Sequence, residues 1–279
     1  MAPERSLTVT ADDFGLSREV NEAVEIAHRE GILTAASLMV AEPWCADAVE
    51  RARRLPGLRV GLHLTLVEGR AMLPASAIPD LLAAHGKLRT DLARYGTAIF
   101  FSRRVAGQVA AEIRAQFEAF GRTGLSLGHV DSHKHYHLHP TIAGLVLHIG
   151  RDFGMTRLRV PVEPPAVLAA MEPVRVGLEA RLAAPYATLL RRRARRAGLA
   201  VADQVFGLAW SGAMTAPRVA GLLRRLPPGL SEIYLHPATR GGFDGAAPGS
   251  AYEAELAALL APAVRAARDE ALGRVHNSA

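Results

Sequence analysis

The sequence has 279 residues, of which 49% are hydrophobic, with 33 basic residues against 27 acidic ones and a mean hydropathy of +0.11. This length can bury a large core, and the composition excludes collagen, a disordered chain and a small disulfide-linked scaffold. The single cysteine, Cys45, cannot form an internal disulfide. Met1 to Arg5 begin no signal-peptide pattern, and the longest apolar runs are about half of a bilayer span, so we expect a cytoplasmic protein.

Positive charge is concentrated between Arg191 and Arg196, where five arginines occur. The net charge of +6 is a modest excess, and no aromatic residues lie among these arginines, so we expect no nucleic-acid partner. Two interpretations of the segment stay open, a solvated helix and an amphipathic basic helix around 178–197 that contacts anionic headgroups. The apolar face of that helix would consist of Leu178, Leu182, Tyr186, Leu189 and Leu190.

Hydrophobic periodicity predicts an alternation of strands and helices along the chain. Short apolar or β-branched runs predict seven strands: Leu7 to Ala11, Ala35 to Val40, Arg59 to Leu64, Leu127 to Asp131, Arg157 to Val160, Ala200 to Val205 and Glu232 to Leu235. Runs at helical spacing predict seven helices: Ser17 to Glu30, Cys45 to Arg54, Arg103 to Phe120, Pro140 to Asp152, Leu178 to Arg196, Ala216 to Arg225 and Ala251 to Glu270. Such alternation is typical of a parallel sheet with helices packed outside it.

The chain shows no long linker or repeat, so we expect one α/β domain over residues 1–279. The segments from Val160 to Pro173 and from Ala238 to Gly249 are interpreted as long functional loops. Polar residues follow several different strands, and the first strand is not followed by a glycine-rich nucleotide-binding fingerprint. These features favour a closed barrel over an open doubly wound sheet.

Two adjacent carboxylates, Asp12 and Asp13, follow the first predicted strand. At the carboxyl end of a barrel strand, one of them can bind a cation while the other handles a proton. The alternative is an Asx-turn or a helix N-cap before Ser17. His63 ends the third predicted strand, where a lone histidine among apolar residues is more often a hydrogen-bonded core residue.

Five of the 11 histidines lie within residues 129–139. Every odd position in this range is His or Asp, so an extended chain would direct all six side chains to one face over roughly 33 Å, and one cation could bind only one or two of them. The pairs His129 and His133, His133 and His137, and Asp131 and His133 all remain open as ligands. A polar strand without metal is the alternative. Imidazole with carboxylate suits Zn, Mn, Fe, Co or Ni, and a carboxylate-rich variant can hold Mg.

The last predicted strand also ends in a histidine, His236, in the sequence Ile233-Tyr234-Leu235-His236-Pro237. In a barrel this residue lies across the mouth from the aspartates of the first strand. It would supply the general acid that such a site needs.

Four motifs, in their order and separations, resemble the YdjC-like carbohydrate deacetylases: TADDFGLS (10–17), GLHL (61–64), HVDSHKHYHLHP (129–140) and YLHP (234–237). Within that family, the stretch from Thr8 to Val40 and LRVGLHLTLVEGR (58–70) resemble the HpnK branch, which is associated with hopanoid biosynthesis. The resemblance covers nearly the whole chain. It implies a distorted TIM-type barrel of about seven strands, similar to polysaccharide deacetylases, with one divalent cation, Mg²⁺ or Zn²⁺.

The same resemblance implies a role for individual residues. The metal ligands would be Asp13, His63 and His133. Asp12 would be the general base, and His236 the acid or the transition-state stabiliser. The substrate cleft would be lined by His135, Arg159 and Glu163. Roles for His129, Asp131, His137 and His139 stay undetermined.

The implied reaction removes the N-acetyl group from an N-acetylglucosaminyl substrate, which in the HpnK branch is a hopanoid lipid. An enzyme acting on such a lipid meets the sugar at the membrane surface, so Arg191 to Arg196 would hold it peripherally at the inner membrane, and we consider a homodimer as its assembly. Three alternatives are a deacetylase of soluble chitooligosaccharides, a two-cation phosphoesterase or amidohydrolase, and a catalytically inactive lipid- or glycan-binding protein. The presence of Asp12, Asp13 and His236 argues against the last.

Overall fold

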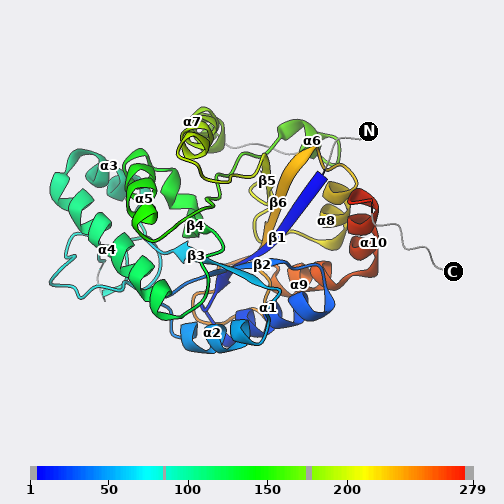
Figure 1. Cartoon of the computed structure of the whole chain (residues 1–279), viewed down its shortest axis with the longest axis horizontal. Coiled ribbons are helices and arrows are strands. Elements are labelled where there is room, and N and C mark those ends of the chain that lie inside the picture. The colour runs from blue at the N-terminus through cyan, green and yellow to red at the C-terminus, as the bar shows by residue number, and fades with distance from the viewer. Residues whose placement is uncertain (1–4, 84–85, 174–177, 274–279) are drawn as a thin grey trace.

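The computed structural model describes residues 5–83, 86–173 and 178–273, with the side chains of 178–183 left out. In this part of the chain, six parallel strands form one sheet in the order β4-β3-β2-β1-β6-β5, which curls into a half-barrel (Figure 1). The strands are β1 (Arg5–Phe14), β2 (Ala35–Leu38), β3 (Arg59–Leu64), β4 (Val130–Ser132), β5 (Gln204–Phe206) and β6 (Gly229–Leu235). The parallel α/β class expected from the sequence is therefore confirmed.

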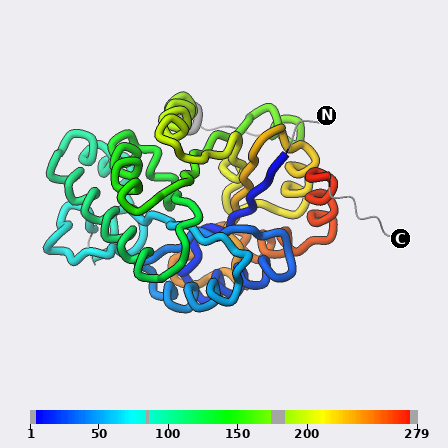
Figure 2. Tube along the Cα trace, viewed as in Figure 1, coloured from blue at the N-terminus to red at the C-terminus, as the bar shows by residue number. Residues whose placement is uncertain are grey.

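The central strand, β1, joins the beginning of the chain to its end. Residues from Thr8 to Phe14 are buried, because β2 pairs with one edge of β1 and β6 with the other. Figure 2 shows the blue start of the chain running beside the orange segment of β6. A parallel strand that is covered on both faces needs apolar side chains or polar ones with a hydrogen-bond partner. Leu7, Val9 and Ala11 are apolar, and the buried hydroxyl of Thr10 donates to Glu232 at 2.8 Å.

Helices cover the outside of the sheet in three groups (Figure 1). The first consists of α1 (Arg18–Glu30) and α2 (Cys45–Arg53), and the second of α3 (Leu92–Phe101), α4 (Arg103–Arg122) and α5 (Pro140–Asp152). The third consists of α8 (Ala216–Leu223), α9 (Tyr252–Leu260) and α10 (Pro262–Ala271). Short helical segments η2 (His133–Leu138) and α6 (Pro165–Ala169) and the longer α7 (Leu178–Arg196) complete the described elements.

The prediction of a closed barrel of about seven strands is wrong, because the described chain has six strands and its sheet is an open half-barrel. The segment from Arg157 to Val160 forms only isolated bridges, in which Leu158 pairs with Val130 and Arg157 with Ala200. It crosses between β4 and β5 without becoming a strand. Pro161 follows at once and has no N–H to donate, so a ladder cannot continue there.

One predicted helix is divided in the structure, and two helices were not predicted. The run from Ala251 to Glu270, predicted as one helix, is divided between Ala261 and Pro262 into α9 and α10. The helix α3 was missed because its sequence, LARYGTAIFF, contains Gly96 and a cluster of aromatic and β-branched residues that are weak helix formers. The short α6, in a segment expected to be a loop, begins at Pro165, which suits the first turn of a helix.

The helix α7 carries the arginine cluster, and part of its apolar face packs against the protein itself. Ala187, Leu190 and Ala194 are buried in the core, whereas Leu189 is 48% exposed. Tyr186 is partly buried, and the side chains of Leu178 and Leu182 lie outside the described residues. In the described part of the chain, the helices are too short or too polar to span a bilayer.

Candidate metal centre and catalytic site

The adjacent aspartates lie at a local irregularity of β1. The pairing of β1 with β2 shifts register between Ala11 and Phe14, and Asp13 has a φ of 63°, a left-handed conformation that is rare for residues other than glycine. Such bulges and strained residues are concentrated at functional sites, where they redirect side chains. The following Gly15, with a φ of 98°, allows the chain to turn into α1.

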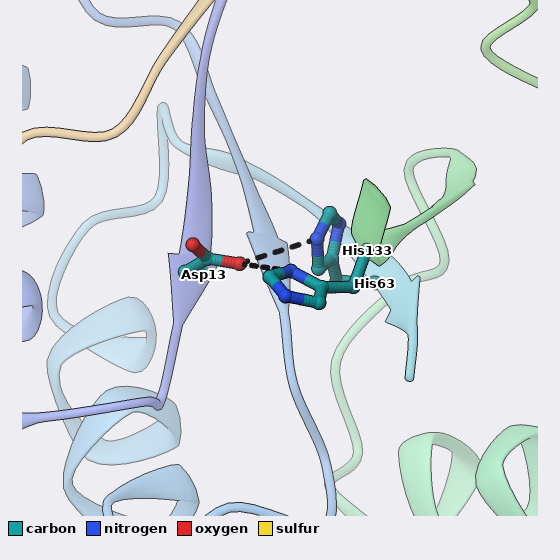
Figure 3. A group of neighbouring side chains, drawn as sticks. All are labelled: Asp13, His63 and His133. Carbon is teal, nitrogen blue, oxygen red and sulfur yellow. Dashed lines mark hydrogen bonds and ion pairs between the residues drawn. The ribbon is translucent and has the colours of Figure 1, made fainter. Parts of the chain in front are cut away.

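Three residues that the sequence analysis expected as metal ligands lie together at the carboxyl ends of their strands (Figure 3). Asp13 Oδ1 is 3.3 Å from His63 Nε2 and 3.0 Å from His133 Nδ1. Asp13 is the residue before the last of β1, His63 is in β3, and His133 directly follows β4. The sheet therefore brings residues that are up to 120 positions apart to one point.

The distances between the ligand atoms of Asp13, His63 and His133 fit a divalent cation. Ligand atoms about 2.1 Å from one ion are separated from each other by about 3.0 to 3.4 Å in octahedral or tetrahedral geometry. The separations of 3.3 Å and 3.0 Å around Asp13 Oδ1 match this range. Two imidazoles and one carboxylate, with further positions open, are a ligand set used by catalytic metal sites.

A second observation supports the fit and concerns the tautomer of His63. Its Nδ1 donates a hydrogen bond to Asp131 Oδ1 at 2.8 Å. A neutral His63 then directs the lone pair of Nε2 at the carboxylate of Asp13, so a proton or a cation is needed between them. Asp131 orients His63 as carboxylates commonly orient metal-binding histidines.

The electrostatics of the site favour positive charge. Burial alone would raise the pKa of Asp13, but His133, His63 and His236 outweigh it and hold that pKa well below its usual value. Burial opposes protonation of His63, but the charge of Asp131 and hydrogen bonds with Asp13 and Asp131 raise its pKa to about 10. The carboxylates that attract a proton here would equally attract a cation.

Asp12 is held by a buried network around Arg159. The guanidinium binds Asp12 through two hydrogen bonds of 2.6 Å and 2.9 Å, and its Nη1 lies 2.7 Å from Asp131 Oδ2. It also contacts Glu232 at 2.9 Å and lies 4.8 Å from the centre of the Tyr234 ring. The side chain of Arg159 has no exposed surface, so its guanidinium lies within this buried network behind Asp12.

Ser37 links the same acids from the other side. Its hydroxyl lies 3.1 Å from Asp12 Oδ1, 2.8 Å from Asp131 Oδ2 and 3.0 Å from His129 Nε2. Sequence reasoning missed Ser37 because a serine inside an apolar strand carries no motif of its own. The only available signal was its position in β2, between the strands that carry the two acids.

His236 follows β6, the strand that pairs with β1. Its backbone N–H donates to Glu255 of α9, and its ring centre is 5.7 Å from that of Tyr234. It is close enough to Asp13 for its charge to lower the pKa of that carboxyl group. The structure thus brings His236 to the same end of the barrel as the aspartates.

The two remaining predicted site residues, His135 and Glu163, have hydrogen-bond partners outside the cluster around Asp13. His135 Nε2 is 2.9 Å from the hydroxyl of Tyr234, while its Nδ1 is buried without a hydrogen-bond partner among the described residues. Glu163 accepts hydrogen bonds from the backbone N–H groups of Gly207, Leu208 and Ala209, at 2.9, 3.2 and 3.0 Å. Its carboxylate therefore holds the loop that follows β5.

The histidine row does not stay extended. β4 ends at Ser132, and Lys134 and His135 both take left-handed backbone conformations in η2. Each imidazole consequently has a different neighbour: His129 contacts Ser37, His137 contacts the carbonyl of Arg159, and His139 contacts the carbonyl of Gly96. Of the rival ligand pairs, none has both members in the cluster around Asp13.

A cleft of about 300 Å³ opens beside this cluster, and His133 forms part of its wall. Its other walls come from loops that follow β1, β2, β3 and β6. These loops all leave the carboxyl ends of the strands, where barrel enzymes carry their active sites.

Comparison with known proteins places these features in a family. A family profile described as YdjC-like protein matches residues 6–270. A carbohydrate deacetylase from Geobacillus stearothermophilus is 31% identical over 235 residues, which cover 84% of this chain and 80% of that protein. A carbohydrate deacetylase from Brevibacillus brevis is 37% identical over 166 residues, 60% of this chain and 62% of that protein.

A carbohydrate deacetylase from Vibrio vulnificus is 40% identical over 145 residues, so the match spans about half of each protein, 51% of this chain and 54% of the relative. Among solved structures, a putative cellobiose-phosphate cleavage protein from Enterococcus faecalis V583 superposes with a TM-score of 0.75. The superposition covers 97% of this chain and 95% of that one at 23% sequence identity. The two proteins therefore share a fold.

Proposed function

We propose that this chain, which belongs to the YdjC-like family, is a metal-dependent carbohydrate deacetylase that removes an N-acetyl group from an N-acetylglucosaminyl substrate. The observation that carries the proposal is the convergence of Asp13, His63 and His133 beside Asp12. The names of the relatives, carbohydrate deacetylases, support the substrate class.

In this proposal Asp13, His63 and His133 hold one divalent cation. When bound, such a cation polarises the acetyl carbonyl and makes a water molecule a stronger nucleophile near neutral pH. Two imidazole ligands favour Zn²⁺ or a related transition metal over Mg²⁺, which prefers oxygen ligands.

Asp12 serves as the general base that removes the proton of the attacking water. The two hydrogen bonds from Arg159 fix the orientation of its carboxylate, and the hydroxyl of Ser37 lies 3.1 Å from Oδ1. Such positioning lets the base meet the water without a side-chain rearrangement. We therefore assign Arg159 a positioning role behind Asp12.

His236 protonates the amide nitrogen as the C–N bond breaks, because an amine leaves far more readily than its anion. The backbone hydrogen bond to Glu255 holds this histidine beside the aspartates, not across the barrel mouth as expected from the sequence, because β6 pairs with β1. The products are acetate and a glucosaminyl amine: the water supplies one carboxylate oxygen of acetate and loses a proton to Asp12, and the leaving nitrogen gains a proton from His236.

The test of this function is a set of single variants assayed for acetate release and for bound metal. Asp13→Ala and His133→Ala should lose both the metal and the activity. Asp12→Asn should keep the metal and lose most of the rate, since general-base catalysis contributes about 10²- to 10⁴-fold. Full activity in Asp12→Asn would show that the base is a different group.

A two-cation phosphoesterase or amidohydrolase is less compatible with the site. A second group of potential ligands, Asp12, His63 and Asp131, shares His63 with the first. Its two carboxylates are already bound by the guanidinium of Arg159, which would repel a second cation. We therefore expect one metal ion per chain.

For the substrate, we propose an N-acetylglucosaminyl hopanoid lipid, as the resemblance to the HpnK branch suggests, with α7 as the membrane contact. Two arginines of the cluster are engaged within the protein: Arg191 donates to the carbonyl of Asp203, and Arg195 binds its carboxylate at 2.6 Å. The exposed members available to headgroups are Arg192, Arg193 and Arg196. At about 1 kcal/mol each, they would contribute about 3 kcal/mol.

Flotation with vesicles that contain phosphatidylglycerol tests this contact. Replacing all three exposed arginines by serine should weaken binding by about 100-fold at low salt. The matched control removes the same charge from exposed positions elsewhere, Arg122, Arg151 and Arg224. Equal losses in the two triple variants would show that α7 has no special part in binding.

A further inference from the structure

We propose that the cleft beside His133 holds a pyranose ring of the substrate against the indole of Trp44. This inference rests on the proposed function and deepens it, because it names a residue that selects a sugar. Trp44 precedes α2, is 40% exposed and lines the cleft together with His133.

The position of Trp44 is not explained by the stability of the fold. Its side chain forms no capping hydrogen bond to α2, although it occupies the N-cap position. Burying an indole is a large source of stabilisation, and this one leaves much of its surface in the cleft. An exposed tryptophan in a concave site is instead typical of ligand binding.

The backbone at Trp44 is fixed relative to the catalytic aspartates. Its N–H donates to the carbonyl of Gly15 at 3.1 Å, and its own carbonyl accepts from Asn21 Nδ2 at 3.0 Å. The side chain of Asn21 also accepts the N–H of Gly15 at 2.8 Å. Gly15 is two residues after Asp13. The backbone that carries the indole is therefore hydrogen-bonded to the same turn that positions the proposed metal ligand.

The composition of the cleft matches the two kinds of surface on a sugar. A pyranose ring has apolar C–H faces and a rim of hydroxyl groups. The cleft offers Trp44, Leu16 and Phe243 as apolar surface, and nearly half of its lining residues are charged. Those charged groups include Glu42 and Arg70 on one side and Arg240 on another, which can bind hydroxyl groups.

The same composition disfavours a lipid tail as the occupant. An acyl or polycyclic chain would have to desolvate several charged side chains, at a cost that hydrophobic contact with one indole does not offset. The sugar is therefore the part of a glycolipid that this cleft would hold, with its acetamido group directed at the wall that contains His133.

The two tryptophans of the chain allow a direct binding test. Trp210 is 6% exposed and does not line the cleft, so Trp210→Phe leaves Trp44 as the reporter. Titration of this variant with N,N′-diacetylchitobiose should give a saturable change in fluorescence. The matched control, Trp44→Phe, retains Trp210 and should show no change.

Kinetics provide the second measurement. Trp44→Ala should raise KM for diacetylchitobiose about 10-fold, with kcat and metal content close to wild type, and Trp44→Phe should recover most of the loss. An unchanged KM in Trp44→Ala would overturn the proposal. So would a response of Trp44 to phosphatidylglycerol vesicles without a response to the sugar.

The binding test separates this inference from the proposed function. If the fluorescence of Trp44 responds to the sugar but the protein releases no acetate, sugar binding at Trp44 is supported and the deacetylase function is refuted. If the enzyme is active but Trp44 does not respond, only sugar binding at Trp44 is refuted. If Trp44 does not respond and no acetate is released, sugar binding at Trp44 and the deacetylase function are both refuted.

Discussion

His137 is a buried histidine whose neutral form is built into the fold. Its Nε2 donates to the carbonyl of Arg159 at 2.8 Å, so Nδ1 carries the lone pair and accepts from the hydroxyl of Ser132 at 2.7 Å. Protonation at Nδ1 would place a donor against that hydroxyl group. We predict that replacing His137 by glutamine, which keeps an N–H donor but cannot titrate, makes stability less dependent on pH.

The magnitude follows from the pKa of His137, which burial lowers from 6.5 to about 4, against smaller opposing effects of the hydrogen bond to the Arg159 carbonyl and the charge of Asp131. Between these two values the unfolded chain binds a proton that the folded chain does not. This contribution to stability is therefore complete above about pH 6.5 and decreases as the pH falls towards 4. pH 5 is about 1.5 units below the pKa of His137 in the unfolded chain, and this difference corresponds to roughly 2 kcal/mol of unfolding free energy.

Urea unfolding at about pH 7.5 and pH 5 measures this effect. The loss of unfolding free energy between the two conditions should be roughly 2 kcal/mol greater in the wild type than in His137→Gln. Other titrating groups are common to both proteins and cancel in the comparison. If both proteins lose the same amount, His137 does not differ in protonation between the folded and unfolded states.

Three further predictions concern residues around the site. Asp131→Asn should weaken metal affinity about 10- to 100-fold in calorimetric titration, because it removes the carboxylate that orients a ligand, and an unchanged affinity would count against that role. Gly61→Ala should lower the unfolding free energy by about 1 to 3 kcal/mol, since the new Cβ would lie 2.4 Å from the buried ring of His129; a wild-type denaturation midpoint would contradict this packing. Glu255→Gln should reduce kcat several-fold with little effect on KM by loosening His236, whereas a change in KM alone would indicate a role in binding.

The fold class was predictable because most long periodic segments form the element that their pattern indicates. The patterns for β1, α1 and α5 combine apolar runs with clear boundaries, such as Ser17, whose hydroxyl accepts the N–H of Val20 at the start of α1. The seventh strand could not be excluded from sequence, since Leu158 and Val160 are buried as in a strand and only the lack of ladder partners distinguishes the segment.

The site was predictable in part, because adjacent carboxylates and a histidine at strand ends share one edge of a parallel sheet. The choice of His133 from its row was given only by family resemblance. Periodicity assumes a regular backbone, and the row bends at Lys134 and His135 into left-handed conformations that no local pattern indicates. The network of Ser37 and Arg159 behind Asp12 depends on how the sheet curls, which long-range packing determines.

The central claim is that one divalent cation, held by Asp13, His63 and His133, is required for removal of an N-acetyl group. The most direct measurement is acetate release from N,N′-diacetylchitobiose and from an N-acetylglucosaminyl lipid by protein stripped with a chelator and then titrated with Zn²⁺. We predict that the stripped protein is inactive and that activity returns in proportion to metal up to one ion per chain. Acetate release that persists in the stripped protein, or that requires two ions per chain, would contradict the account.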